Sequence, residues 1–406
     1  MRKILILFFL VVTVSNAFGQ GQAFIGQDTA ARPIITAVPF LMISPDARSG
    51  AMGDAGAAIS PDANSAHWNV GKLVFAEKDF GASLSYTPWL GKIVDDMNLL
   101  YLAGFYKLDD LQAIAFSLRY FDLGEIFLTE DGRTPIAPNF RPQELAIDAS
   151  YSRKLSEKLG LGVTGRYIYS NLAGEVPVSS TQVATPGNSI AADVGLYYNS
   201  DLVVGARDGN LALAAVISNI GNKISYLDES TESFIPTNLR IGTAYTANLD
   251  PFNKITVAVD FNKLLVPTPP IYETDETGQY VYGPDGNPNV IDGRDPNRPL
   301  VNGIFTSVAD APDGFSEELK EITIASGLEY WYNDLFAARA GYFWEHDLKG
   351  ARKFFTLGVG LRYQVLNFDF AYLIPQQQQH PLAETLRFTL GVNFVKANTN
   401  NRPDQQ

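Results

Sequence analysis

The chain has 406 residues, of which 46% are hydrophobic, 12% aromatic and 18% charged. Its net charge of -13 argues against nucleic acid as a partner, because phosphates repel an acidic surface. It contains no cysteine, which excludes disulfide bonds and thiolate metal sites.

The first 19 residues are predicted to be a secretory signal peptide. Arg2 and Lys3 supply its positive start, residues 4–14 its apolar core, and residues 17–19 a small-x-small cleavage site. We therefore expect the mature chain to leave the cytoplasm. No later run of about twenty apolar residues predicts a transmembrane helix.

Residues 20–78 do not alternate between apolar and polar residues, and they are dense in small residues between Ser44 and Ala58. Small side chains let backbones pack closely together. We expect this segment to form a compact plug, or hatch, inside the lumen of the barrel that the following residues predict.

Fourteen segments between residues 79 and 395 alternate an apolar residue with a polar or small one. In the last of them, Phe388 and Leu390 point one way while Arg387 and Thr389 point the other. Bulky apolar residues on one face and polar or small residues on the other are typical of lipid outside and a polar lumen inside. The segments are 80–87, 98–107, 111–121, 143–154, 159–170, 189–199, 211–219, 238–247, 254–262, 321–332, 336–345, 353–363, 365–374 and 384–395.

The pattern predicts an all-β fold, a 14-stranded antiparallel transmembrane β-barrel over residues 79–395, followed by a polar tail at 396–406. Tight connectors alternate with long ones along the chain, apart from a rather long even connector at 200–210. Outer-membrane barrels have short periplasmic turns and long outer loops, so we expect a periplasmic amino terminus and extracellular long loops. The long connectors are 122–142, 171–188, 221–237 and 263–320.

The predicted inward face carries charges of both signs in nearly equal number. Lone charges away from bulk water are costly, so we expect interior ion pairs and not an open diffusion pore. The charges are Arg119, Arg166, Arg240, Arg339, Arg362 and Arg387 against Asp148, Asp193, Asp260, Glu329 and Asp369.

Aromatic residues near the strand ends are expected to form girdles at the two membrane interfaces. Such residues anchor a barrel and say nothing about its substrate. They are Tyr86, Trp89, Tyr101, Tyr120, Tyr169, Tyr198, Trp331, Trp344 and Tyr372.

The connector at 263–320 is the strongest candidate for a partner surface. It holds eight prolines, six glycines and ten acidic residues, with aromatic residues between them. Aromatic side chains on a semi-rigid stretch make good interface anchors, whereas a disordered excursion is the alternative interpretation. The candidate partner-binding residues are Tyr272, Tyr280, Tyr282, Phe305 and Phe315.

The sequence predicts no catalytic, cofactor or metal site. His67, His346 and His380 are its only histidines, and no pattern joins them to a nucleophile. No phosphate-binding loop, metal-ligand spacing or dinucleotide motif is present.

The hatch segment resembles that of a known family. Ala-Met-Gly-x-Ala-Gly-Ala from residue 51, Pro-Asp-Ala at 61–63 and Trp-Asn at 68–69 are similar to the hatch of the FadL family of fourteen-stranded outer-membrane barrels. Within it, the resemblance is closest to the PorV family of the type IX secretion system of Bacteroidetes. Where many members have Trp-Asn-Pro-Ala, this chain has Val70 and Gly71, so the rigid proline turn is missing. The hatch residues that the motif matches are Met52, Gly53, Gly56, Trp68 and Asn69.

The resemblance implies a non-enzymatic outer-membrane component of type IX secretion, without a cofactor and surrounded by outer-membrane lipids. Such a protein binds secreted proteins through their carboxy-terminal signal domains at a large translocon barrel. It delivers them to a cell-surface attachment complex that contains a PorU-like sortase. One alternative is a FadL-type transporter of hydrophobic small molecules, and another is a lipopolysaccharide deacylase with His346 or His380 at the outer rim.

Overall fold

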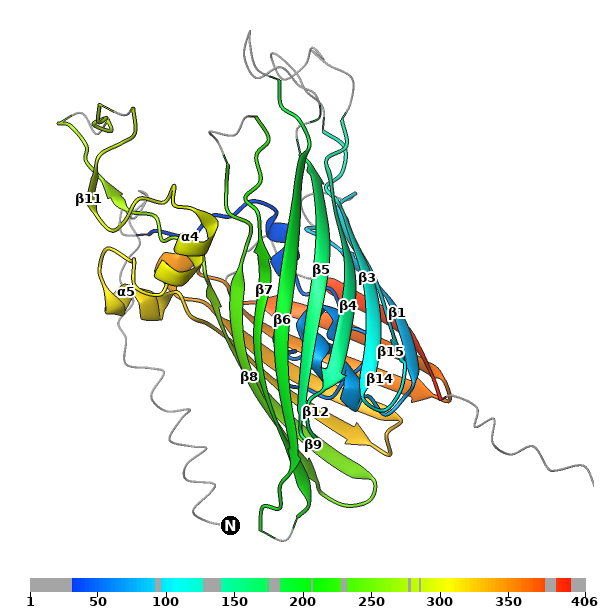
Figure 1. Cartoon of the computed structure of the whole chain (residues 1–406). Coiled ribbons are helices and arrows are strands. Elements are labelled where there is room, and N and C mark those ends of the chain that lie inside the picture. Colours follow the sequence, from blue (N-terminus) through cyan, green and yellow to red (C-terminus); the bar gives the residue numbers. More distant parts are fainter. Residues whose placement is uncertain are drawn as a thin grey trace, which may run out of the picture. The chain divides into compact units, whose positions relative to one another are not determined.

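The computed structural model describes residues 31–91, 96–126, 140–172, 174, 183–205, 207–227, 232–276, 279–284, 286–376 and 385–395. Fourteen antiparallel strands form a closed barrel in which each strand pairs with its neighbours in chain order and β16 closes on β1 (Figure 1). The predicted fold class is confirmed. The barrel strands are β1 Phe80–Pro88, β2 Asn98–Lys107, β3 Gln112–Asp122, β4 Gln143–Lys154, β5 Leu159–Asn171, β6 Gly187–Asp201, β7 Gly209–Gly221, β8 Asn238–Asn248, β9 Asn253–Leu264, β12 Thr323–Tyr332, β13 Phe336–Trp344, β14 Lys353–Tyr363, β15 Leu366–Pro375 and β16 Leu386–Phe394.

The two faces of the wall follow the alternation in the sequence. In β6 buried and exposed residues alternate along most of the strand. In β16 Arg387 and Thr389 are buried in the lumen, while Leu390 is exposed on the outside. A period of two puts every second side chain on the lipid face, so these strands bury their polar face inward.

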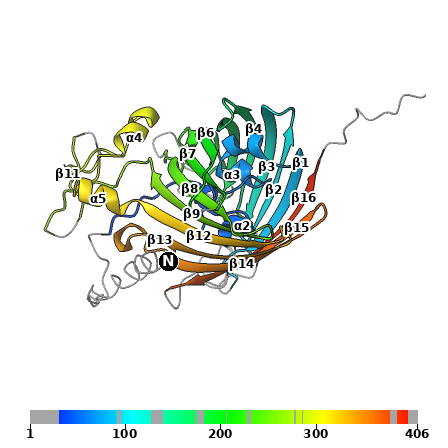
Figure 2. The same ribbon diagram turned by 90° about the horizontal axis from the view of Figure 1, so that it is seen from below.

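The hatch lies inside the barrel, and Figure 2 shows α2 and α3 within the ring of strands. It consists of short helices, namely η2 Pro39–Met42, α2 Ala47–Gly50, α3 Ser65–Trp68 and η3 Val70–Phe75. Among the described residues, no helix is long and apolar enough to cross a membrane. The predicted signal peptide, residues 20–30 and the tail at 396–406 lie outside the described residues.

The described chain starts at the end of the barrel that carries the long connectors. The backbone amide of Arg32 donates to the carbonyl of Leu348 at 3.2 Å, and that of Ala37 donates to Phe234 at 2.9 Å. The hatch then crosses the lumen, and Ala76 accepts from the Lys107 side chain beside the start of β1. The alternation of short and long connectors indicates at which end of the barrel β1 starts. It carries no information on where the hatch, which precedes β1, begins. The expected periplasmic amino terminus itself lies outside the described residues and stays a prediction.

Two of the predicted girdle aromatics point into the lumen instead. Tyr101 and Trp331 are buried, and Tyr101 packs in one cluster with Leu73 and Val74 of the hatch. The inward face of β2 is apolar where it meets the hatch, and Phe105 lies in the same cluster. Tyr101 thus packs against the hatch because its register faces inward, whereas Trp331 lies beneath Arg339 and Arg362 of the wall, at 5.4 and 4.0 Å from the ring centre.

Candidate functional site

A buried arginine of the hatch, Arg48 in α2, binds the barrel wall. Its guanidinium donates to both carboxylate oxygens of Glu329 in β12, at 2.9 and 2.8 Å, and to Asp62 at 2.9 Å. Glu329 also accepts from Arg339 of β13 at 2.7 Å, and Arg339 donates to Asp369 of β15 at 2.7 Å. We call these five residues the lumen network. Opposite charges in this geometry offset the cost of burial, so the network fastens the hatch to three strands.

Backbone amides of the hatch also bind side chains of the wall. Asp260 of β9 accepts from the amides of Gly56 and Ala57, at 2.8 and 2.9 Å. Thr356 of β14 accepts from the amide of Gly53 at 2.9 Å. Buried backbone groups need such partners, so the irregular hatch obtains from the wall the hydrogen bonds that it lacks internally.

The glycines of the hatch motif allow close contact with the wall. Gly53 has a positive φ of 67°, and the loop of Met52 and Gly53 rests on two glycines of the wall. A Cβ at Gly327 would lie 2.5 Å from the Cβ of Met52, and one at Gly341 would lie 2.0 Å from the Gly53 nitrogen. Side chains at these positions would push the hatch away from the wall.

Trp68 and Asn69 hold the turn that lacks the family's proline. A Cβ at Gly56 would lie 2.1 Å from the ring of Trp68, so the indole packs directly on that glycine. The side chain of Asn69 accepts from the Gly71 amide at 3.0 Å and donates to the Leu196 carbonyl at 3.0 Å. This side-chain cap takes the place of the proline.

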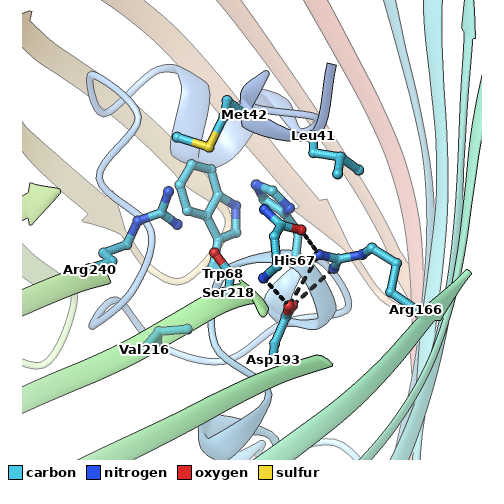
Figure 3. Close-up of a pocket in the computed structure, with 10 residues that line it drawn as sticks. Leu41, Met42, His67, Trp68, Arg166, Asp193, Val216, Ser218 and Arg240 are labelled. Carbon is cyan, nitrogen blue, oxygen red and sulfur yellow. Dashed lines mark hydrogen bonds and ion pairs between the residues drawn. The ribbon is translucent and has the colours of Figure 1, made fainter. Parts of the chain in front are cut away.

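Two small cavities flank Trp68, each with a volume of about 10 Å³. Figure 3 shows the first, with Trp68 and Arg240 on one side and Arg166 and Asp193 on the other. A cavity of this size has room for about one water molecule. Neither cavity accommodates a hydrophobic ligand.

The interior ion pairs expected from the sequence are present around Arg166. It binds Asp148 at 2.7 Å and Asp193 at 2.9 Å, and all three residues are buried. In these pairs and in the lumen network, each buried charged side chain is paired with one of opposite charge.

Other inward arginines bind the hatch instead of the wall's carboxylates. Arg119 donates to the carbonyls of Phe40 and Leu41, at 3.0 and 2.8 Å. The guanidinium of Arg240 lies 4.6 Å from the centre of the Trp68 ring. Arg387 likewise pairs with Asp54 of the hatch at 3.2 Å. Counting charges on the strands alone could not reveal these partners.

The described part of the long connector between β9 and β12 is folded, which contradicts the alternative of a disordered excursion. Its two short strands pair with each other, and two short helices follow (Figure 1). Its elements are β10 Ile271–Tyr272, β11 Val290–Asp292, α4 Leu300–Thr306 and α5 Phe315–Lys320.

A cluster of ion pairs fastens α5 to the rim of the barrel. Three carboxylates, two on α5 and one just after it, meet three cations from distant parts of the chain. The pairs are Lys263 with Glu318 and Glu321, Lys349 with Glu317 and Glu321, and Arg32 with Glu317, at N–O distances of 2.6–2.9 Å. We call these six residues the rim cluster. The sequence alone did not predict this cluster, although the adjacent Glu317 and Glu318 close to Phe315 were a signal.

The five candidate partner-binding residues lie in two places in this connector. Tyr280 and Tyr282, which are 53% and 61% exposed, belong to the segment between β10 and β11, and the ring of Tyr272 lies 5.3 Å from that of Tyr280. Phe305 and Phe315 lie on α4 and α5, and each is 75% exposed. The five residues are thus two separate groups.

Acidification is expected to loosen α5 from the rim. Burial would raise the pKa of Glu317, but hydrogen bonds from Arg32, Lys349 and the Asp313 amide outweigh it and lower the pKa to about 2. Since the folded pKa lies below the unfolded value, the stabilisation is present at neutral pH and is lost as the pH falls from about 4.5 towards 2. Pepsin digestion across this range should show increasing cleavage of the connector.

The variant Glu317→Gln tests the same contact at neutral pH. It should increase tryptic cleavage in the connector, whereas the control Glu276→Gln at an exposed position should not. Equal cleavage of the two variants would show that Glu317 does not hold α5 in place.

The two described histidines are each engaged by a hydrogen bond. Nδ1 of His67 accepts from Arg119 at 2.6 Å, and His67 lies in the hatch. Nδ1 of His346 accepts from the amide of Leu348 at 3.2 Å. His380 lies outside the described residues. Within the described ranges, no group of three or more metal-ligating residues comes together.

A family model for the type IX secretion system protein PorV matches residues 26–271. The chain belongs to the PorV family. Its matched region runs from the hatch through β9 to the start of the long connector, and the resemblance seen in the hatch motif is thereby confirmed. The PorV family belongs to type IX secretion and is not a family of enzymes.

Solved structures that resemble this PorV family member include two toluene transporters and a FadL homologue, all at low identity. The toluene transporter TbuX of Ralstonia pickettii is 12% identical, with a TM-score of 0.48 over 86% of this chain and 98% of that one. The toluene transporter TodX of P. putida is 12% identical, with a TM-score of 0.47 over 87% and 99%. A FadL homologue of Pseudomonas aeruginosa is 12% identical, with a TM-score of 0.43 over 90% and 100%. No curated protein matches the chain.

Proposed function

We propose that this protein is an outer-membrane binding module of type IX secretion. It receives secreted proteins through their carboxy-terminal signal domains at the large translocon barrel and passes them to the attachment complex with its PorU-like sortase. In this proposal the long loops are extracellular and carry out recognition, while the hatch keeps the membrane sealed. The membership in the PorV family supports it.

The observation that carries the proposal is the filled lumen beside a folded, exposed connector. The lumen network fastens the hatch to the wall, and the cavities beside Trp68 hold about 10 Å³ each. A folded protein cannot pass through such a lumen. This supports binding on the outside, where the rim cluster holds the connector and Tyr280 and Tyr282 are exposed.

The alternative of a FadL-type transporter needs an apolar path through the wall and past the hatch. The contacts of the wall residues Glu329, Asp260 and Thr356 with the hatch oppose its displacement. The deacylase alternative needs His346 or His380 as a base at the outer rim; the Leu348 amide occupies Nδ1 of His346, and His380 lies outside the described residues. The binding module therefore remains the function that the geometry favours.

The double variant Tyr280→Ala/Tyr282→Ala is expected to weaken partner binding at least about tenfold, because exposed tyrosines at an interface contribute about 1–2 kcal/mol each. The measurement is affinity purification of the tagged protein from its own outer membrane in mild detergent, with mass spectrometry of the proteins recovered. From the wild type we expect a very large barrel and proteins with a shared carboxy-terminal domain.

The control is Tyr332→Ala, which removes an exposed tyrosine at the opposite end of the barrel. Unchanged recovery with the double variant would exclude these tyrosines as the contact. Recovery of the barrel alone with bound fatty acid or lipid would favour the transporter instead.

A further inference from the structure

The helix α5 has its polarity inverted relative to a helix that faces water. Its carboxylates Glu317 and Glu318 are 2% and 5% exposed, whereas Phe315 and Leu319 are 75% and 50% exposed. A surface helix in water normally buries its apolar residues and exposes its charges. The barrel wall has the same inverted arrangement because lipid surrounds it.

The neighbouring helix α4 adds a second apolar face. Val301 and Phe305, one helical turn apart, are 65% and 75% exposed, and the segment Leu300–Thr306 contains no charged residue. On the opposite side, Gly303 is buried, and a Cβ there would lie 2.6 Å from the ring of Phe234. The helix is thus held on its inner side and leaves its larger apolar side chains outside.

The rim cluster holds α5 beside the outer face of the wall. Lys263 is two residues from Phe261 on β9, so it leaves the strand on the same, outward face. Phe261 is exposed on the outside, and it pairs with Ile324, which in turn pairs with Trp344. Lys263 binds Glu318 of α5, so the helix is fixed just beyond this row. Figures 1 and 2 show α4 and α5 outside the ring of strands.

The outward-facing row of Phe261, Ile324 and Trp344 is apolar and ends in a tryptophan, which is typical of the membrane interface. Lipid that covers Phe261 and Ile324 also reaches the residues directly beyond them. The carboxylates of α5 turn inward to Lys263, Lys349 and Arg32, which removes their repulsion of lipid phosphates.

We propose that the outward face of Val301, Phe305, Phe315 and Leu319 lies on the outer leaflet of the membrane. This face, the lipid seat, is a lateral continuation of the barrel's lipid-facing surface. It holds the connector at a fixed height, so Tyr280 and Tyr282 stand clear of the bilayer. The inference is independent of the proposed secretion function, because it needs only the barrel and the surrounding lipid.

The absence of cysteine allows single labels at chosen positions. Phe305→Cys and Phe315→Cys, both at exposed sites, would carry a bimane fluorophore, with Leu328→Cys as the lipid-facing control and Tyr282→Cys as the water-facing control. Each protein is reconstituted alone into phosphatidylcholine vesicles with brominated acyl chains. Aqueous iodide is added in parallel, and heat-modified gel mobility verifies folding.

We expect bromolipid to quench the labels at 305 and 315 at least half as strongly as the label at 328. Iodide should quench them several-fold less than the label at 282. Iodide quenching equal to that at 282 would overturn the proposal. Shielding that appears only in native outer membranes, and not in vesicles, would also overturn it and assign the face to a protein partner.

Discussion

Replacing Glu329 with glutamine is expected to lower the free energy of unfolding by about 3–5 kcal/mol, the usual cost of removing one partner from a buried ion pair. Glu329 lies between Arg48 of the hatch and Arg339 of β13, at 2.8 and 2.7 Å. Glutamine keeps the shape but leaves both arginines without this negative charge. Urea unfolding of the reconstituted protein, followed by tryptophan fluorescence, measures the change.

The matched control is Asp334→Asn, which removes one partner of the exposed pair between Lys254 and Asp334. Solvent screens such a pair, so a change of less than about 1 kcal/mol is expected. If Glu329→Gln also stays within that limit, the lumen network does not hold the hatch.

Replacing Gly341 with valine is expected to displace the hatch from the wall and to let small molecules pass through the lumen. A Cβ at this position would lie 2.0 Å from the backbone nitrogen of Gly53. The valine therefore fits only if the hatch backbone at Gly53 moves away from β13. Overpacking of this kind typically costs about 1–3 kcal/mol or more. Valine suits a strand, so the barrel itself should still form. Efflux of a small dye from vesicles that contain the protein measures the leak.

The control for this variant is Gly165→Val on β5. That glycine has no heavy atom within 4 Å of an added Cβ, so the valine enters open space on the outer face. We expect vesicles with this variant to remain as tight as those with the wild type. Equal tightness with Gly341→Val would mean that the hatch adjusts around the valine and stays in place.

Parts of the candidate site could be predicted because their signals are local. The density of small residues around Met52 and Gly56 indicated close packing, and both lie against other side chains in the lumen. The exposed Tyr280 and Tyr282 were visible as aromatics in a proline-rich connector. The role of Arg48 was not visible, because its partner Glu329 lies 281 residues away.

Contacts between residues far apart in the sequence also explain the positions that the sequence pattern did not predict correctly. Tyr101 was expected at a membrane interface, but it meets the hatch in the lumen, and a strand pattern does not show what fills its inner side. The position of Arg32 beside the long connectors was also hidden, because its contacts with Glu317 and Leu348 join segments about three hundred residues apart.

The amino-acid pattern alone predicts the fourteen strands, their lipid and lumen faces, the hatch segment and the position of the large connector. These features depend on a period of two and on the composition of neighbouring residues, which are local properties of the chain. The folded barrel is needed to see which charges pair, how the hatch is fastened, and that α5 turns Glu317 inward and Phe315 outward. Those outcomes depend on contacts across the closed barrel, because a buried charge must find its partner wherever the fold brings one.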